Sequence, residues 1–298
     1  MRSPVRRLTD WLEYLAALAF FGALSLLPAR TASDFGGWLG RIIGPHIGRT
    51  RLARQQMAEH LPELSQAARD AAIREMWENL GRTLTEYPHL KNARLAEHIT
   101  VSGAEHIDAA IESGKPVLMI SGHIGNWEIC SFICTRRGMK LHLLYRPPNN
   151  PLIDKLIDRV RLSFNAGHYG KGKEGARGAM RAILKGDSVG VLIDQKDNEG
   201  ASIPFLGAPA MTSVVMARLA LKYQLPVIPA RAVRHQGIVQ EVIFYPPLSL
   251  PEGKDEAAAV ALMQQMNEII SSWVRERPGQ WFWLHRRWPK GDGHVTAA

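Results

Sequence analysis

The chain has 298 residues, of which 46% are hydrophobic and 22% are charged. This length and composition provide enough apolar surface for a packed core and exclude a wholly disordered protein. The formal net charge of +9 favours anionic partners, such as nucleic acid, anionic lipid headgroups, phosphorylated glycolipids or an acidic carrier protein. Charge alone does not choose among them.

The first thirty residues combine positive charge with an apolar run. Three arginines stand among the first seven residues, and Glu13 is the only charged residue in the run 11–29. A membrane-spanning helix needs about 20 apolar residues, so this run is borderline. We expect residues 1–30 to anchor the chain in, or dip into, the cytoplasmic leaflet of a membrane. The alternative is a buried helix of a soluble domain.

Residues 31–98 are expected to form a helical region. Apolar side chains at positions 73, 76, 77, 80 and 84 follow the i, i+3, i+4 spacing of one helix face. The helical pattern extends from residue 52 to about residue 95.

From residue 99 the pattern alternates between short β-rich runs and helical runs, which predicts an α/β core over residues 99–298. The expected fold is a mixed sheet flanked by helices. The predicted strands are 116–121, 141–145, 188–193, 226–233 and 239–245. The predicted helices are 152–164, 174–184, 213–223 and 256–275. A short turn at 235–237 joins the last two strands and predicts an antiparallel pair at one edge of the sheet.

The two cysteines, Cys130 and Cys134, lie four residues apart in an apolar stretch. That spacing puts them on one helix face, where we expect small core residues. The sequence near these cysteines has no second pair of Cys or His residues at zinc-binding spacing. We expect no metal and no cofactor.

A histidine follows one of the predicted buried strands. The apolar run 117–120 leads into Ser121-Gly-His-Ile-Gly-Asn-Trp-Glu, and ligands bind at the carboxyl ends of strands in α/β sheets. His123 in the turn is a natural general base, and Glu128 in the following helix would orient its ring. The nucleophile would then be a hydroxyl of the substrate. The residues alone equally permit a polar turn, with His123 capping a helix and Glu128 solvated.

The spacing His-x-x-x-x-Glu after an apolar strand resembles the signature of the glycerolipid and lysophospholipid acyltransferase superfamily. More of the chain, from about residue 10 to residue 289, resembles one branch, the bacterial lipid A biosynthesis acyltransferases of the lauroyl/myristoyl type. The further segments that carry this resemblance are, in order, Tyr145-Arg146-Pro147, Asn150-Pro151-Leu152, Arg161, Asp194-Gln195, Phe205-Leu206-Gly207 and Trp283-Leu-His-Arg-Arg-Trp288.

The resemblance implies transfer of a fatty acyl chain from acyl carrier protein to a hydroxyl of a lipid A precursor, at the cytoplasmic face of the bacterial inner membrane. His123 would remove the hydroxyl proton and Glu128 would orient His123. The oxyanion donors would be backbone N–H groups after Gly125 and the side chain of Arg161.

Four residues are candidates for substrate binding. Arg161 and Arg146 could hold a phosphate or sugar of the acceptor. Asp194 closes an apolar strand and lies at the same sheet edge as His123 if the two strands are parallel. Gln195 could assist Asp194.

Two other functions remain to be weighed. The same residues could acylate another lipid, such as a lysophospholipid or a glycosylated phosphatidylinositol, from acyl-CoA. A nucleic-acid-binding protein would explain the charge, but the chain contains no recognised nucleic-acid module.

The tryptophans and arginines at 281–288 could bind lipid at an interface or form a packing segment.

Overall fold

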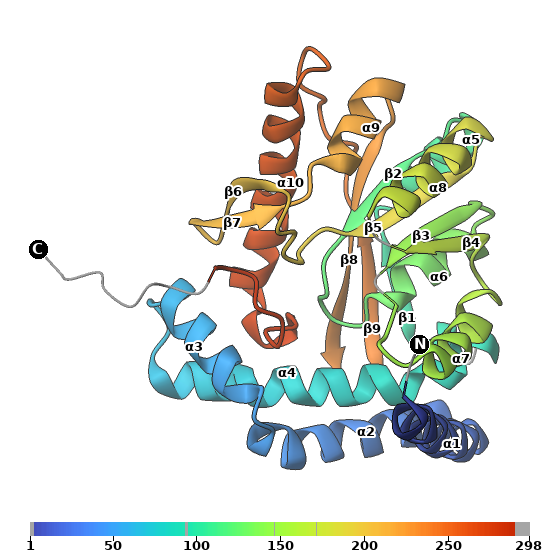
Figure 1. Ribbon diagram of the computed structural model, residues 1–298, viewed down its shortest axis with the longest axis vertical. Helices are drawn as coiled ribbons and strands as arrows, with labels where there is room; N and C mark the ends of the chain where they lie inside the picture. The colour runs from blue at the N-terminus through green and yellow to red at the C-terminus, as the bar shows by residue number, and fades with distance from the viewer. Residues whose placement is uncertain (1–2, 93–94, 146, 171, 290–298) are drawn as a thin grey trace, which may run out of the picture.

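A seven-stranded mixed sheet forms the centre of the molecule (Figure 1). The computed structural model describes residues 3–92, 95–145, 147–170 and 172–289. The strand order is β1 (Ile99–Ser102), β9 (Val239–Phe244), β8 (Val227–Gln236), β2 (Leu118–Ser121), β5 (Ser188–Leu192), β3 (Leu141–Tyr145) and β4 (Gly167–Gly170).

Five neighbouring strands, from β8 to β4, are parallel to one another. The five predicted strands correspond to β2, β3, β5, β8 and β9 and are confirmed within a few residues, whereas β4 was not predicted. The predicted antiparallel pair, β8 and β9, is also confirmed. Its predicted position at the edge is wrong, because β1 adds to β9 in parallel and forms the edge instead.

Helices cover both faces of the sheet, which confirms the predicted α/β class. One face carries α8 (Lys173–Leu184), α9 (Val215–Tyr223), α10 (Glu256–Glu276) and a separate hairpin of β6 (Ala201–Phe205) and β7 (Ala208–Thr212). The other face carries α5 (Ala104–Glu112), α6 (Glu128–Arg136) and α7 (Pro151–Arg161). Short 3-10 helices are η1 (Gly44–His46), η2 (Tyr87–Asn92), η3 (Ala96–His98) and η4 (Pro278–Gln280).

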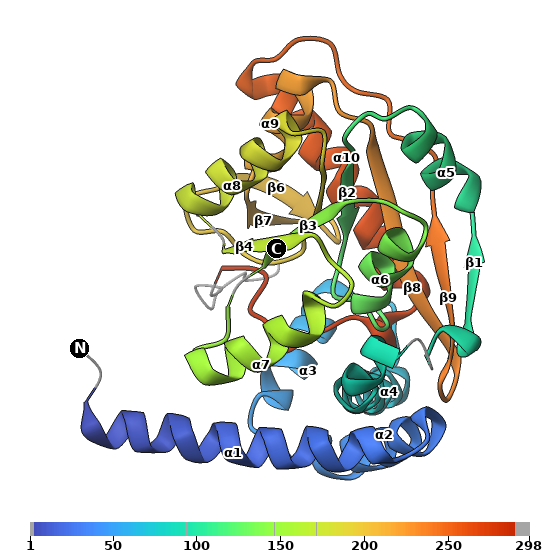
Figure 2. The same ribbon diagram turned by 90° about the vertical axis from the view of Figure 1, so that its right-hand side faces the viewer.

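Four helices precede the sheet. They are α1 (Pro4–Leu26), α2 (Ala29–Ile43), α3 (Thr50–His60) and α4 (Gln66–Glu86). The helical pattern expected from residue 52 is thus two helices, because Pro62 interrupts it and Ser65 caps α4 through the N–H of Ala68. In Figures 1 and 2, α4 lies beneath the sheet, and α1 and α2 form the layer below α4.

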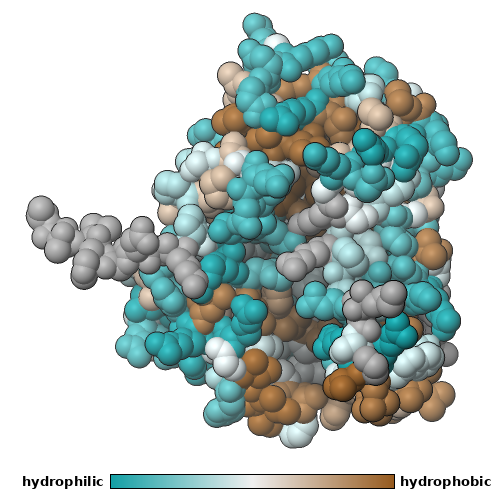
Figure 3. Space-filling model, in the orientation of Figure 1, coloured by the Kyte–Doolittle hydropathy of each residue, from teal (hydrophilic) through white to brown (hydrophobic). Residues whose placement is uncertain are grey.

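The layer of α1 and α2 exposes large apolar side chains, and Figure 3 shows them as a brown band along the lower margin of the molecule. We call them the N-terminal apolar surface; they include Leu8, Trp11, Leu12, Leu15, Leu18, Phe35, Trp38, Ile42 and Ile43. Trp11 is 53% exposed and Trp38 is 58% exposed. Among the described residues, no helix combines the length and the apolarity needed to cross a membrane.

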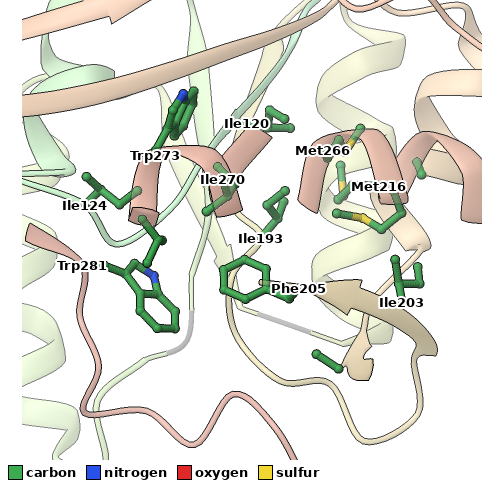
Figure 4. Close-up of a cluster of buried hydrophobic side chains, with 14 of the residues drawn as sticks. Ile120, Ile124, Ile193, Ile203, Phe205, Met216, Met266, Ile270, Trp273 and Trp281 are labelled. Carbon is green, nitrogen blue, oxygen red and sulfur yellow. The ribbon is translucent and has the colours of Figure 1, made fainter. Parts of the chain in front are cut away.

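The main core lies between the sheet and α10. Along β2, Leu118 and Ile120 point into this core, while Met119 joins the second core under α5 and α6. A strand buried on both faces in this way is a continuous apolar run, which is why it was visible in the sequence. Figure 4 shows Ile120, Ile193 and Phe205 gathered against Ile270 of α10.

Glycines let α2 and α4 approach closely. A Cβ atom added to Gly81 would lie 2.0 Å from the carbonyl oxygen of Gly36, and one added to Gly40 would lie 2.1 Å from that of Trp77. Backbone atoms cannot move aside as side chains can. Glycine at these positions therefore fixes how the lower helices pack on the rest of the fold.

We predict that Gly81→Ala lowers the free energy of unfolding by about 1–3 kcal/mol, despite the better helix propensity of alanine. Gly22→Ala in α1 is the matched control, since a Cβ there meets no atom within 4 Å. The control should be neutral or stabilising by up to about 1 kcal/mol. Urea unfolding followed by circular dichroism measures both; equal stability of the two variants would contradict the tight packing of α2 on α4.

Candidate active site

The chain makes a tight turn where β2 ends at Ser121. Gly125 in this turn has a φ of +57°, and a Cβ there would lie 2.3 Å from the carbonyl oxygen of Ala232 on β8. Only glycine suits both conditions. The turn presents His123 at the carboxyl edge of the sheet, and α6 begins five residues later at Glu128.

His123 is bound at two points by Asp194. The Nδ1 atom of the ring lies 2.8 Å from Asp194 Oδ1, and the backbone N–H of His123 donates to Asp194 Oδ2 at 2.7 Å. Trp281 Nε1–H also donates to Asp194 Oδ2, at 2.7 Å. The carboxylate thus fixes both the ring and the backbone of the histidine.

Asp194 is only 3% exposed, and burial by itself favours a neutral carboxyl group and raises its pKa. The opposing effects of the nearby His123 charge and of the hydrogen bonds from His123 and Trp281 are larger, and they hold the pKa of Asp194 far below its ordinary value. The carboxylate is therefore ionised at neutral pH. An ionised carboxylate only accepts, so His123 Nδ1 carries a hydrogen, and in the neutral form of the ring Nε2 carries the lone pair.

Parallel pairing of β2 and β5 brings these two residues together. Ser121 is in register with Leu192, so the residues two positions beyond each strand end lie side by side. The expectation that Asp194 lies at the same sheet edge as His123 is met.

Glu128 does not contact His123 as the sequence led us to expect. Its carboxylate, buried at 5% exposure, binds Arg161 at the end of α7 through two contacts, Arg161 Nε to Oε2 at 3.1 Å and Arg161 Nη2 to Oε1 at 2.5 Å. Burial lowers the pKa of Arg161, but the charge of Glu128, the hydrogen bond to it and the effects of Tyr87 and Tyr145 together outweigh burial, so the pKa lies above its ordinary value. The observed partner of the histidine is Asp194, a residue far along the chain.

Arg161 was expected to donate to the oxyanion, but its guanidinium group is paired with Glu128. The guanidinium group also lies 4.8 Å from the ring centre of Tyr145. Arg161 is thus held by Glu128 and Tyr145. His123 is oriented by a different carboxylate, that of Asp194.

A pocket opens beside the Glu128–Arg161 pair. Its walls are mostly apolar and come from β2, β3, β5 and α6; they include Met119, Cys130, Leu143, Gly190 and Val191. Trp127 lines the pocket too, and its ring centre lies 5.1 Å from that of His123. The histidine and the pocket therefore adjoin through Trp127.

Gln195 lies on the outward side of His123. The Nε2 atom of Gln195 is 3.4 Å from His123 Nε2 and 3.3 Å from His285 Nε2. Phe282 packs against both imidazole rings, with ring centres 6.1 Å from His123 and 4.6 Å from His285. Gln195 thus contacts the Nε2 atom of His123, whereas Asp194, which it was expected to assist, binds Nδ1.

A buried ionic network holds the turn from below. Glu86, the last residue of α4, is fully buried and binds Arg234 of β8 through both oxygens, at 2.6 and 2.9 Å. The same carboxylate accepts from Asn126 of the turn at 2.8 Å and from Ser33 of α2 at 2.7 Å. Burial raises the pKa of Glu86, but the Arg234 charge and these hydrogen bonds outweigh it and lower the pKa below its ordinary value.

Two amide side chains complete this support. Asn79 of α4 accepts from Arg234 Nε at 2.8 Å and donates to the Gly125 carbonyl at 3.0 Å. The side chain of Gln280 binds the backbone N–H and carbonyl of Arg234. The backbone carbonyl of Gln280 accepts from the Gly125 N–H at 3.0 Å. The turn is therefore fixed by α4, β8 and the segment before Trp281.

The remaining sequence candidates fall into three groups. Arg146 lies outside the described residues. Cys130 and Cys134 are buried core residues as expected, and burial raises the pKa of Cys130 to about 12. In the segment 281–288 the three tryptophans are buried, and so is Arg287, which donates to Met211 O and Thr212 Oγ1; the same segment brings Trp281 and His285 to the site.

Sequence reasoning missed Glu86, Asn126, Arg234 and His285. Arg234 carried a usable signal, since a charge inside an apolar strand needs a buried partner. His285 stood in the quoted Trp-Leu-His-Arg-Arg-Trp segment without a role. Nothing in the sequence marks Glu86 as different from other helix-terminal acids.

Comparison with known proteins identifies the family. A family model described as bacterial lipid A biosynthesis acyltransferase matches residues 2–290. The lipid A biosynthesis palmitoleoyltransferase of Escherichia coli (strain K12) is 26% identical over 291 residues, covering 90% of this chain and 89% of the relative. The lauroyltransferase of the same strain is 26% identical over 292 residues, covering 93% and 91%.

A relative with a different named activity has nearly the same sequence identity to this chain as the two lipid A enzymes. The phosphatidylinositol mannoside acyltransferase of Mycobacterium tuberculosis (strain ATCC 25618 / H37Rv) is 25% identical over 295 residues, covering 96% of this chain and 90% of the relative. Because the family model spans nearly the whole sequence, the chain belongs to the bacterial lipid A biosynthesis acyltransferase family and is an acyltransferase.

Proposed function

We propose that the protein transfers a fatty acyl chain from acyl carrier protein to a hydroxyl group of a lipid A precursor, at the cytoplasmic face of the bacterial inner membrane. The observation that carries the proposal is the His123–Asp194 pair, which leaves His123 Nε2 as a base beside an apolar pocket. Family membership supports the lipid A-type acceptor.

In the proposed reaction His123 is the general base. The acceptor hydroxyl gives its proton to Nε2 as its oxygen attacks the thioester carbonyl carbon. Asp194 stabilises the resulting imidazolium and holds the ring in the productive tautomer. When the tetrahedral intermediate collapses, the C–S bond breaks and the proton passes from His123 to the departing sulfur. Such general-base assistance contributes about 10²–10⁴-fold to the rate.

Glu128 and Arg161 then belong to substrate binding. Their ion pair forms one wall of the pocket that adjoins His123 through Trp127. The apolar lining from the three strands suits a fatty acyl chain. Arg146 remains a candidate for binding the acceptor phosphate or sugar.

The acyl donor is the second element of the proposal. A chain of net charge +9 attracts an acidic carrier protein by long-range electrostatics, which raises the rate of encounter. Acyl-CoA is anionic as well, so the two donors must be compared directly.

The N-terminal apolar surface supports attachment to a membrane. Surfaces of this size and apolarity on soluble monomers are rare, and they usually mark contacts with lipid or another protein. The exposed Arg30 and Arg49 lie on the same two-helix layer and the loop after it. Each basic residue near an anionic bilayer contributes about 1 kcal/mol to binding. We therefore propose that α1 and α2 lie on, or dip into, the lipid leaflet that holds the acceptor.

A second acceptor class has its own support. The similarity to a mycobacterial phosphatidylinositol mannoside acyltransferase covers as much of the chain as the similarity to the lipid A enzymes. The alternative is therefore acylation of another glycolipid or a lysophospholipid, with the same base and the same pocket.

The function is tested by incubating the purified protein with acyl-acyl carrier protein or acyl-CoA, and with a lipid A precursor or a phosphatidylinositol mannoside. We expect mass spectrometry to find the acylated lipid A precursor, formed faster from the carrier protein. Product from the mannoside alone would support the alternative. No acylated lipid from any pair would contradict both.

We predict that Asp194→Asn lowers kcat by about 10²–10⁴-fold with little change in KM, because an amide does not hold His123 in the same tautomer. His123→Ala should lose at least as much. Glu128→Gln should mainly raise KM for the acyl donor, because Glu128 binds Arg161 and not the base. Steady-state kinetics with circular dichroism of each variant measures this; a kcat loss confined to Glu128→Gln would reverse the assignment.

We predict that replacing Leu12 and Leu15 together by serine lowers partition onto anionic phospholipid vesicles at least tenfold. Each leucine side chain moved from water into an apolar phase is worth about 1.5–3 kcal/mol. The control is Leu184→Ser on α8, which is 65% exposed but lies outside the N-terminal apolar surface. Vesicle co-sedimentation measures all three proteins, and equal binding of the double variant and wild type would refute the lipid contact.

A further inference from the structure

One amide side chain lies between two imidazole rings in the site. Gln195 follows Asp194 directly in the chain, so the strand end that orients the base also sets the amide beside it. Its Nε2 atom is 3.4 Å from His123 Nε2 and 3.3 Å from His285 Nε2, and the two ring centres are 5.6 Å apart.

The direction of these contacts follows from Asp194. Because His123 Nδ1 donates to the carboxylate, His123 Nε2 has a lone pair and accepts. An amide nitrogen carries two hydrogens and accepts nothing, so Gln195 donates one hydrogen toward each imidazole. At 3.4 and 3.3 Å both contacts are longer than the usual 2.7–3.2 Å of an N–H hydrogen bond and are therefore weak.

The contact between Gln195 and His123 is the one that the reaction removes. A substrate hydroxyl that gives its proton to His123 must occupy Nε2, and it displaces the amide hydrogen from there. Once the proton has moved, Nε2 carries a hydrogen and no longer accepts. A donor is thus released beside the base at the moment when the carbonyl oxygen becomes negative.

His285 is well placed to steer the amide through its other hydrogen. The backbone carbonyl of His285 accepts from Gln56 of α3 at 2.8 Å, and Gln56 also accepts from the N–H of Arg287 at 2.9 Å. The imidazole packs edge-on against Phe282. The ring therefore has a fixed position from which its Nε2 holds Gln195.

We propose that Gln195 is a catalytic residue that binds the oxyanion of the tetrahedral intermediate, and that His285 is a positioning residue that holds its amide. The inference rests on the proposed acyl transfer. As the acceptor oxygen bonds to the carbonyl carbon, the hydroxyl proton moves to His123 and the carbonyl π electrons move to the oxygen, which Gln195 Nε2 binds. On collapse the electron pair returns, the C–S bond breaks, and the thiolate takes the proton from His123.

The test measures kcat and KM with acyl-acyl carrier protein and a lipid A precursor. Gln195→Met has nearly the same size and no donor; it should lower kcat by about 10²–10³-fold and leave KM within about threefold, as removal of an oxyanion donor does. His285→Leu should lower kcat by about tenfold. Since His285 acts through Gln195, the double variant should be no slower than Gln195→Met. His285→Asn, which keeps an acceptor, should recover part of the loss.

The matched control is His235→Gln, a half-exposed histidine near the end of β8, which should leave both constants unchanged. Thermal unfolding of each variant separates loss of fold from loss of rate, and Gln195→Glu, with no donor, replaces Gln195→Met if the latter does not fold. A near-wild-type kcat for Gln195→Met, where His123→Ala is inactive, would overturn the inference but not the proposed function. Losses that multiply in the double variant would overturn the role of His285.

Discussion

The buried pair of Glu86 and Arg234 is the interaction on which the catalytic edge of the sheet depends. Neither charge reaches water, and a buried ion left without its partner costs several kcal/mol. Satisfying both requires α4, β8, the turn after β2 and α2 to meet at one point, since Asn126 and Ser33 bind the same carboxylate. The histidine turn is therefore positioned by a long-range charge pair and not by its own short sequence.

Much of the fold could be predicted because the central strands are buried on both faces and are continuous apolar runs. The hairpin of β6 and β7 could not, since Pro204 and Pro209 face each other within it and prolines are depleted in strands. Its turn at Leu206 and Gly207 has positive φ at both residues, which suits a two-residue hairpin, but leucine gives no sign of that conformation. The edge strand β1 is only partly buried and alternates apolar residues with Thr100 and Ser102, so it has no continuous apolar run.

For the site, strand ends were the reliable signal. They put His123 and Asp194 at one edge of the sheet, because parallel strands bring their carboxyl ends together, although Asp194 was expected to bind substrate and instead contacts His123. The partner of Glu128 was not predictable from its spacing to His123. A residue in the first turn of a helix can face several neighbours, and the choice of Arg161 depends on how α7 packs beside α6, which local sequence does not encode. His285 and Trp281 enter the site only because the segment after α10 folds back onto the turn.

Trp281 donates a hydrogen bond to Asp194, although it follows Asp194 by more than eighty residues in the chain. A ribosome adds about 5–20 residues per second and completes the sheet strands well before this tryptophan emerges. A nascent chain can therefore have formed β2 and β5 while the carboxylate beside His123 still lacks one of its donors. The support around the base is therefore complete only once the segment after α10 has been synthesised and has folded back onto the turn.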